Sequence, residues 1–155
     1  MSGKFIGGGI VFLALIAGIA IYYLQVYHYY DEVDATAGQV TLTLLEGPAD
    51  PIVTDNLRII DATSSPIRYR ACFNTPHSLA MLTETYQFYE GAEPLVAPHW
   101  FDCFDAIEVG KALKEGRALA FLGQKNISHG VDRVVAVHED GRGFVWHQVN
   151  EEIKK

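Results

Sequence analysis

The chain has 155 residues, of which 49% are hydrophobic and 20% charged, and its formal net charge is -7. This length suits one domain with an appendage, and the sequence shows no repeat of the kind that builds solenoids. The acidic balance leaves no basic patch that could neutralise phosphates, which excludes nucleic acid as a partner.

The first thirty residues predict a membrane anchor. Residues 5–24 contain no charged residue, and a helix of that length matches a hydrocarbon layer of ~30 Å at ~1.5 Å per residue. We expect an uncleaved signal anchor with a cytoplasmic stub in residues 1–30; a cleaved signal peptide is the alternative. Amphipathic rings favour the membrane interface, and the expected interfacial belt comprises Tyr22, Tyr23, Tyr27, Tyr29 and Tyr30.

Charge around this helix predicts its orientation. Lys4 and the terminal amine precede it, whereas only acidic residues follow closely, and basic residues set topology. We therefore expect a single-pass protein of a bacterial inner membrane, with a cytoplasmic N-terminus. Residues 31–38 are then a linker, and residues 39–155 form a periplasmic domain. The lipid bilayer is an expected partner through the membrane helix.

Small residues recur along one face of the expected membrane helix. Such residues let a second helix approach closely, which predicts partner-helix packing. The alternative is that glycine and alanine are simply common in membrane helices. The residues of this face are Gly3, Gly7, Ala14 and Gly18.

The remaining chain predicts an α+β domain of four to six mainly antiparallel strands and two helices. Residues 40–44 alternate with period two, as in a half-buried strand. Residues 57–62 and 67–73 flank a turn-like stretch and are expected to pair. Arg68, Arg70 and Cys72 then share one face of the second strand. Residues 118–122 form another strand, and residues 131–138 and 144–149 form a final hairpin.

Two helices are expected between these strands. The first has Thr75 as N-cap and Pro76 at its first position, and Gly91 closes it. The second starts at Asp102, has Asp105 three residues later and runs to Gly116. The buried stripe of the first helix is expected to contain Leu79, Leu82, Tyr86 and Tyr89.

The two cysteines predict a structural disulfide. In an oxidising compartment a small, even number of cysteines favours a bridge, here between Cys72 and Cys103. The bridge would close a loop of about 30 residues, for which the chain-entropy estimate is roughly 3–4 kcal/mol. Two unpaired, buried cysteines are a further alternative.

A thiol or metal site is the main rival interpretation. A thiol at a helix N-terminus has a lowered pKa, and thiolate and imidazole donors together suit copper or zinc. The candidate set is Cys72, Cys103, His77 and His99, but their spacing matches no tight metal motif. His138 and His147 are the other histidine pair, because they could face each other across the last hairpin.

Catalytic motifs are missing from the sequence. There is no nucleophile elbow, no phosphate-binding loop and no dinucleotide fingerprint. We therefore expect neither an enzyme nor a bound cofactor.

Several stretches resemble an uncharacterised family of small single-pass membrane proteins of alphaproteobacteria. They are IRYRACF, SLAMLTETY, WFDCFDAIEVG, ALAFLG, GVDRVVAV and WHQVNE. The resemblance covers nearly the whole chain and implies a compartment and an architecture, but no catalytic residue. Some members carry a histidine-kinase label, which this chain does not support because it lacks a dimerisation helix and an ATP-binding domain.

Taken together, these features predict a non-enzymatic accessory or assembly subunit that binds an inner-membrane respiratory or photosynthetic complex. The acidic charge also allows attraction to a basic periplasmic protein such as cytochrome c, although solubility explains the same charge. The alternative function is a periplasmic thiol or metal handling factor that uses the cysteine and histidine set named above.

Overall fold

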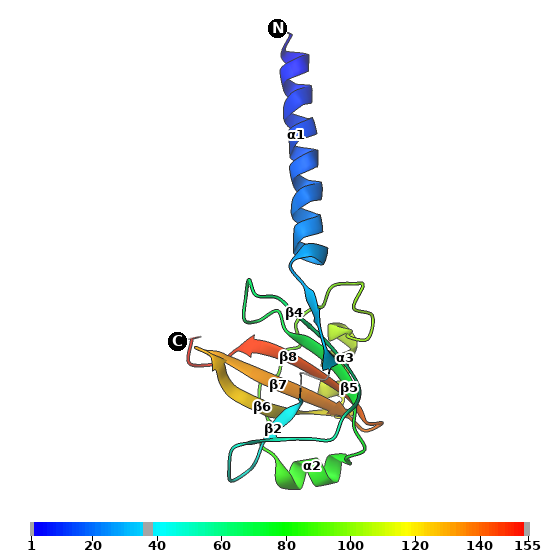
Figure 1. The fold of residues 1–155 in the computed structure, drawn as a ribbon, viewed down its shortest axis with the longest axis vertical. Helices are drawn as coiled ribbons and strands as arrows, with labels where there is room; N and C mark the ends of the chain where they lie inside the picture. Colours follow the sequence, from blue (N-terminus) through cyan, green and yellow to red (C-terminus); the bar gives the residue numbers. More distant parts are fainter. Residues whose placement is uncertain (1, 36–38, 154–155) are drawn as a thin grey trace.

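An apolar helix begins the chain and stands away from the folded domain in the computed structural model, which describes residues 2–35 and 39–153 (Figure 1). The helix comprises α1 (Gly3–Tyr23) and a π-helical turn, η1 (Leu24–His28). Among the described residues it is the one helix with the length and hydropathy of a membrane span, with a mean hydropathy of 2.4 over its apolar window. The side chains of α1 are exposed, as the single span expected from the sequence requires.

A six-stranded antiparallel sheet forms the domain, in the order β1-β4-β5-β8-β7-β6. A two-stranded ribbon of β2 and β3 packs beside it. The α+β fold expected from the sequence is confirmed. The strands are β1 (Asp31–Val33), β2 (Thr41–Thr43), β3 (Ala49–Pro51), β4 (Asp55–Asp61), β5 (Arg70–Asn74), β6 (Ala118–Ser128), β7 (Val131–His138) and β8 (Arg142–Val149).

The start of the expected linker is part of the sheet. Asp31–Val33 forms β1, which pairs with β4 so that Asp31 lies opposite Asp61. An edge strand needs only one partner, and the alternation of residues 31–33 was too short to reveal it. Residues 36–38 of the expected linker lie outside the described residues, as do Met1 and the last two residues of the expected domain.

Both faces of the sheet are covered, which explains the long apolar runs of its central strands. On one face Ala71 and Phe73 of β5 join a core with Leu82 and Phe121. On the other face Cys72 joins a core built around Trp146, with Phe101, Phe104 and Val109. The alternation expected for β5 is therefore present, with Cys72 on one side and Ala71 and Phe73 on the other.

The first soluble helix is shorter than expected. α2 (Leu79–Thr85) begins after Ser78, whose hydroxyl accepts a hydrogen bond from the Met81 N–H. Thr75 lies before the helix and is not its N-cap: its hydroxyl donates to the Val53 carbonyl and accepts from the His77 N–H, and its own N–H donates to the Gly141 carbonyl. The helix ends well before Gly91, since Tyr86 is extended and bridges to Leu44.

The second soluble helix also starts later than expected. α3 (Ala106–Lys114) has Asp105 as its N-cap, with the carboxylate accepting from the N–H groups of Ile107 and Glu108. Asp102 instead pairs with Arg58 of β4, 2.8 Å away. Gly116 follows the helix with a φ of 72°, a conformation that glycine adopts without strain and that commonly ends helices.

Candidate functional site

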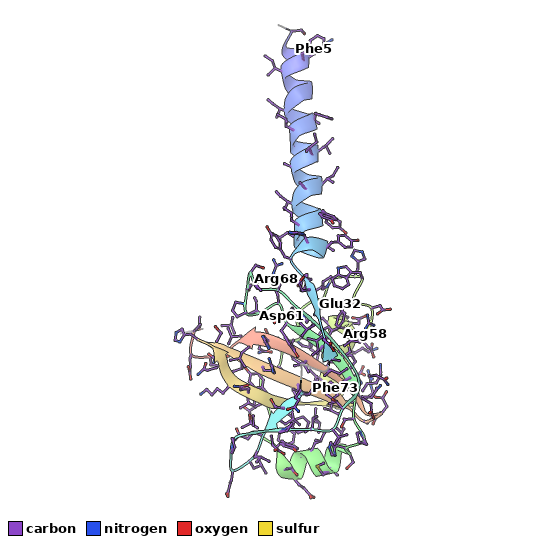
Figure 2. The ribbon with its side chains drawn as sticks, viewed as in Figure 1. Phe5, Glu32, Arg58, Asp61, Arg68 and Phe73 are labelled. Atoms are coloured by element: carbon purple, nitrogen blue, oxygen red, sulfur yellow. A yellow bond between two sulfur atoms is a disulfide. The ribbon has the colours of Figure 1, made fainter. Side chains whose placement is uncertain are left out.

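The most distinctive feature of the molecule is the junction between the apolar helix and the domain. Only Tyr29 and Tyr30 separate η1 from β1, so no flexible spacer intervenes. Two loops of the domain, residues 63–69 and 91–105, reach toward the end of the helix, and Figure 2 shows Arg68 beside that end. Residues 24–30 and these two loops together form the junction.

Polar side chains of the domain donate hydrogen bonds to the end of the helix. Trp100 donates its indole N–H to the carbonyl oxygen of Val26 at 2.7 Å, one of the carbonyls that the end of a helix leaves without a partner. Arg68 donates to the side-chain oxygen of Gln25 at 2.7 Å, and its guanidinium lies over the Tyr30 ring. A cation here also complements the negative end of the helix dipole.

Aromatic rings complete the junction. The Tyr27 hydroxyl and the His99 ring nitrogen Nε2 are 2.9 Å apart, and their rings meet edge to face. Tyr30 makes a similar contact with Trp100, with centroids 6.2 Å apart. Two of the five tyrosines of the expected interfacial belt, Tyr27 and Tyr30, therefore contact the domain, and the other three make ring contacts within the helix end: Tyr22 and Tyr23 with Tyr27, and Tyr29 with His28.

A buried arginine holds the two loops together. Arg70 is 4% exposed and donates to four backbone carbonyls, those of Ile67 and Tyr69 near one loop and of Leu95 and Val96 in the other. Burial lowers the pKa of Arg70 to about 10, so the side chain still carries its charge at neutral pH. Four charge-assisted hydrogen bonds offset the cost of burying that charge.

A histidine fixes the first loop from the sheet side. His147 of β8 lies within hydrogen-bonding distance of the Pro66 carbonyl at Nδ1, 2.7 Å away, and accepts from Arg133 at Nε2. It also stacks on Tyr69, with ring centroids 4.5 Å apart. Burial lowers the pKa of His147 to about 4, with Arg133 and Arg70 contributing in the same direction. The neutral ring that results donates from Nδ1 and accepts at Nε2, as these contacts require.

A disulfide fixes the second loop. Cys72 of β5 and Cys103 are joined, with Cα atoms 6.2 Å apart and 31 residues of separation. Cys72 is buried in the core around Trp146, so the bridge ties the loop directly to the sheet. This is the pairing that the cysteine count favours.

The residues of the proposed thiol or metal site do not come together. Both cysteines are in the disulfide, and His99 contacts Tyr27. His77 precedes α2, which lies at the end of the domain away from α1 (Figure 1). The parts of the chain that the structure describes contain no group of three or more His, Cys, Asp or Glu residues that could hold a metal ion.

The second histidine pair is also separated. Across the final hairpin His147 lies opposite Arg133, and the pairing of β7 with β8 ends with Val137 opposite Gly143. His138 instead lies opposite Ala118 of β6. The expectation that His138 and His147 face each other is therefore wrong, because the strand register places them at opposite ends of the hairpin.

The small-residue face lies on the part of α1 that projects from the domain. Nothing lies within 4 Å of a Cβ built at Gly3, Gly7 or Gly18, and Ala14 is exposed. The face is therefore open to another helix. Figure 2 shows Phe5 near the outer end of the same helix, far from the domain.

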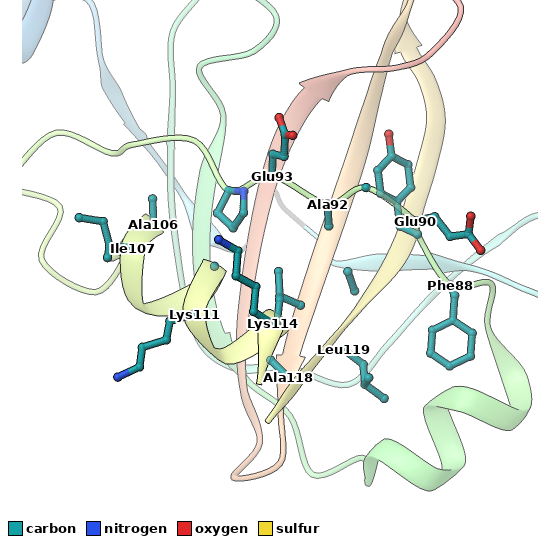
Figure 3. Close-up of a pocket in the computed structure, with 16 residues that line it drawn as sticks. Phe88, Glu90, Ala92, Glu93, Ala106, Ile107, Lys111, Lys114, Ala118 and Leu119 are labelled. Atoms are coloured by element: carbon teal, nitrogen blue, oxygen red, sulfur yellow. The ribbon is translucent and has the colours of Figure 1, made fainter. Parts of the chain in front are cut away.

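An open groove of about 920 Å³ runs between α3, the start of β6 and residues 88–94. Its floor includes Leu113, Ala118 and Leu119. Figure 3 shows Lys111 and Lys114 on the helix side, and Glu90 and Glu93 on the other. Ile107 at the rim is 83% exposed. This groove is apolar inside and carries charged side chains on both sides, which is the character of a ligand-binding surface.

The sequence did not reveal most residues of the junction. Arg68 and Arg70 were placed on one face of a strand, but nothing showed that one would hold the helix and the other two loops. The available signal was the position of Trp100 and His99 in residues 94–100, a stretch rich in proline and free of charge, a composition that suits a membrane interface.

These features define a class: an α+β domain carried directly on one apolar N-terminal helix. Residues 40–155 match the family of unknown function DUF6446, and the chain belongs to that family. This agrees with the expected membership of an uncharacterised family. No curated protein and no solved structure is significantly similar to the chain.

Proposed function

We propose that this protein is a membrane-anchored accessory or assembly subunit of an inner-membrane protein complex, with its domain on the periplasmic side. The observation that carries the proposal is the junction, which joins the domain to the helix without a flexible spacer. A domain held in this way does not move freely on a tether. It presents the same surface, at the same height, to whatever lies beside it in the membrane.

Two further features support a partner in the same membrane. The open small-residue face of α1 allows close approach of a second helix. The groove beside α3 gives the domain an apolar surface with charges of both signs at its rim. The disulfide fits an oxidising compartment, and Lys4 favours a cytoplasmic N-terminus.

Site-specific photocrosslinking in cells tests the proposal. A benzophenone amino acid replaces Ala14, on the small-residue face, or Phe12, which lies on the opposite side at about 100° per residue. We expect crosslinking from position 14 to one defined membrane protein, and little from position 12. Equal crosslinking from both positions, or crosslinks to lipid alone, would contradict a helix partner.

The groove is tested in the same way. The crosslinker replaces Ile107, at the groove rim, or Val53, which is 58% exposed at another part of the domain. We expect a crosslink from position 107 to the protein captured from position 14, or to another subunit of its complex. A crosslink from position 53 of equal strength would show that the groove is not the contact surface.

A further inference from the structure

The junction also fixes the height of a loop that the proposed function does not use. Residues 94–100, with the sequence PLVAPHW, contain no charged residue. Val96 is 76% exposed, among the most exposed apolar side chains of the domain.

Contacts with the helix place this loop at the membrane surface. Trp100 bonds to Val26 and His99 contacts Tyr27, and both helix residues come directly after the uncharged run of residues 5–24. A run of that length fills the hydrocarbon layer, so Val26 and Tyr27 lie at headgroup level. Residues bonded to them lie at the same level.

Hydrogen bonds fix the backbone of residues 94–100. Arg70 donates to the carbonyls of Leu95 and Val96 at 2.9 and 3.1 Å. The Phe101 N–H donates to the Pro98 carbonyl, which closes a turn. The exposed Val96 side chain is therefore presented by a fixed backbone, so inserting it into lipid orders no additional chain.

We propose that residues 94–100 insert into the headgroup region of the bilayer, as a second contact with lipid besides the helix. Val96 supplies an apolar side chain, and Trp100 supplies an amphipathic ring of the kind that concentrates at this depth. The occupant is lipid rather than protein, because the contacts to Val26 and Tyr27 set the loop at bilayer height. The inference relies on α1 as the membrane helix and not on any protein partner.

Tryptophan quenching by brominated lipid tests the insertion in the full chain, reconstituted into vesicles of phosphatidylcholine and phosphatidylglycerol. The chain has two tryptophans, and Trp146 is fully buried. In Val96→Trp we expect more quenching than in the wild type, and more from bromine near the headgroup end of the acyl chain than from bromine near its methyl end. Val53→Trp is the matched control and should add no quenching. The Val53 carbonyl accepts from Thr75, which follows the end of β5 that lies away from the junction.

Trp100→Phe gives an independent readout. It should remove most of the quenching seen in the wild type, because the remaining tryptophan, Trp146, is buried and out of reach of the lipid. Quenching in Val96→Trp no greater than in Val53→Trp would overturn the lipid contact and leave Val96 to a protein partner. Flotation of the vesicles separates this result from a failure of anchoring: a chain that does not float with the vesicles overturns the membrane helix itself.

Discussion

The indole N–H of Trp100 donates to the backbone carbonyl of Val26 at 2.7 Å, across 74 residues of sequence. This bond joins a loop of the domain to the last turn of the apolar helix. Because Arg68 and His99 contact neighbouring residues of the same turn, the helix and the domain are held in one orientation.

Replacing Trp100 with Phe should loosen the junction. The variant keeps an aromatic ring but leaves the Val26 carbonyl without its donor, a loss of about 1 kcal/mol for a typical hydrogen bond. Hydrogen exchange measured by mass spectrometry in detergent should show faster exchange in residues 24–34 and an unchanged sheet. Ile107→Ala, at a residue 83% exposed on α3, is the control. Unchanged exchange in residues 24–34 would show that the bond does not hold the junction.

Replacing Arg70 with Met should destabilise the whole domain. The change leaves four backbone carbonyls in two loops without their donor, and the free energy of unfolding should fall by about 3 kcal/mol or more. Urea unfolding followed by fluorescence measures the change. Arg142→Met, which removes only the exposed pair with Asp140, should cost less than about 1 kcal/mol. Similar losses in the two variants would contradict the role assigned to Arg70.

His147 should make the domain less stable in mild acid. Its pKa is about 4 in the folded chain, against 6.5 for an ordinary histidine. Between these pH values the unfolded chain binds the extra proton, so this contribution is complete above pH 6.5, falls as the pH drops toward 4 and then levels off. Its size is on the order of 3 kcal/mol.

Comparing unfolding of the wild type and His147→Gln over this pH range isolates the effect. The variant should show a shallower fall in unfolding free energy, because its side chain does not titrate. His129→Gln, at an exposed position, should follow the wild type. If unfolding free energy falls with pH as steeply in His147→Gln as in the wild type, the acid sensitivity comes from other groups. His138 is one of them, because burial lowers its pKa too.

Removing the disulfide should lower stability without changing the fold. The bridge joins two residues that are 31 positions apart in the sequence. Its loss in the double variant Cys72→Ala and Cys103→Ala should lower the free energy of unfolding by roughly 3–4 kcal/mol. Urea unfolding of the wild type with and without reductant gives a second estimate. Agreement between the two is expected, since both cysteines of the chain are in the bridge. Unfolding midpoints that do not move would show that the bridge adds no stability.

The sequence predicted the elements of the fold better than their boundaries. Periodicity found the helix, the central strands and the final hairpin, because these bury regular apolar patterns. The two helix starts were misplaced because each region offers two good capping residues. Asp105 caps α3 because Asp102 is taken by Arg58, 44 residues away, and Ser78 caps α2 because Thr75 bonds to Val53 and Gly141. Such choices depend on distant contacts.

The junction was less predictable for the same reason. The tyrosine belt and the cysteine pairing follow from composition and spacing. The roles of Arg70 and Trp100 depend on which two loops meet at the end of the helix, and these loops are 22 or more residues apart in the sequence. Short edge strands such as β1 give too little pattern to detect, so the absence of a flexible spacer was seen only in the structure.

Affinity purification in a mild detergent shows whether the chain holds a membrane complex through the open face of its helix. The full chain, tagged at its C-terminus and present at native level, is compared with Gly7→Leu, which places a bulky side chain on the open helix face, and with Phe12→Leu as the control on the opposite face. The account predicts that the wild type and Phe12→Leu retain one membrane complex in constant proportion, and that Gly7→Leu loses most of it. Recovery of the wild-type chain alone would contradict it.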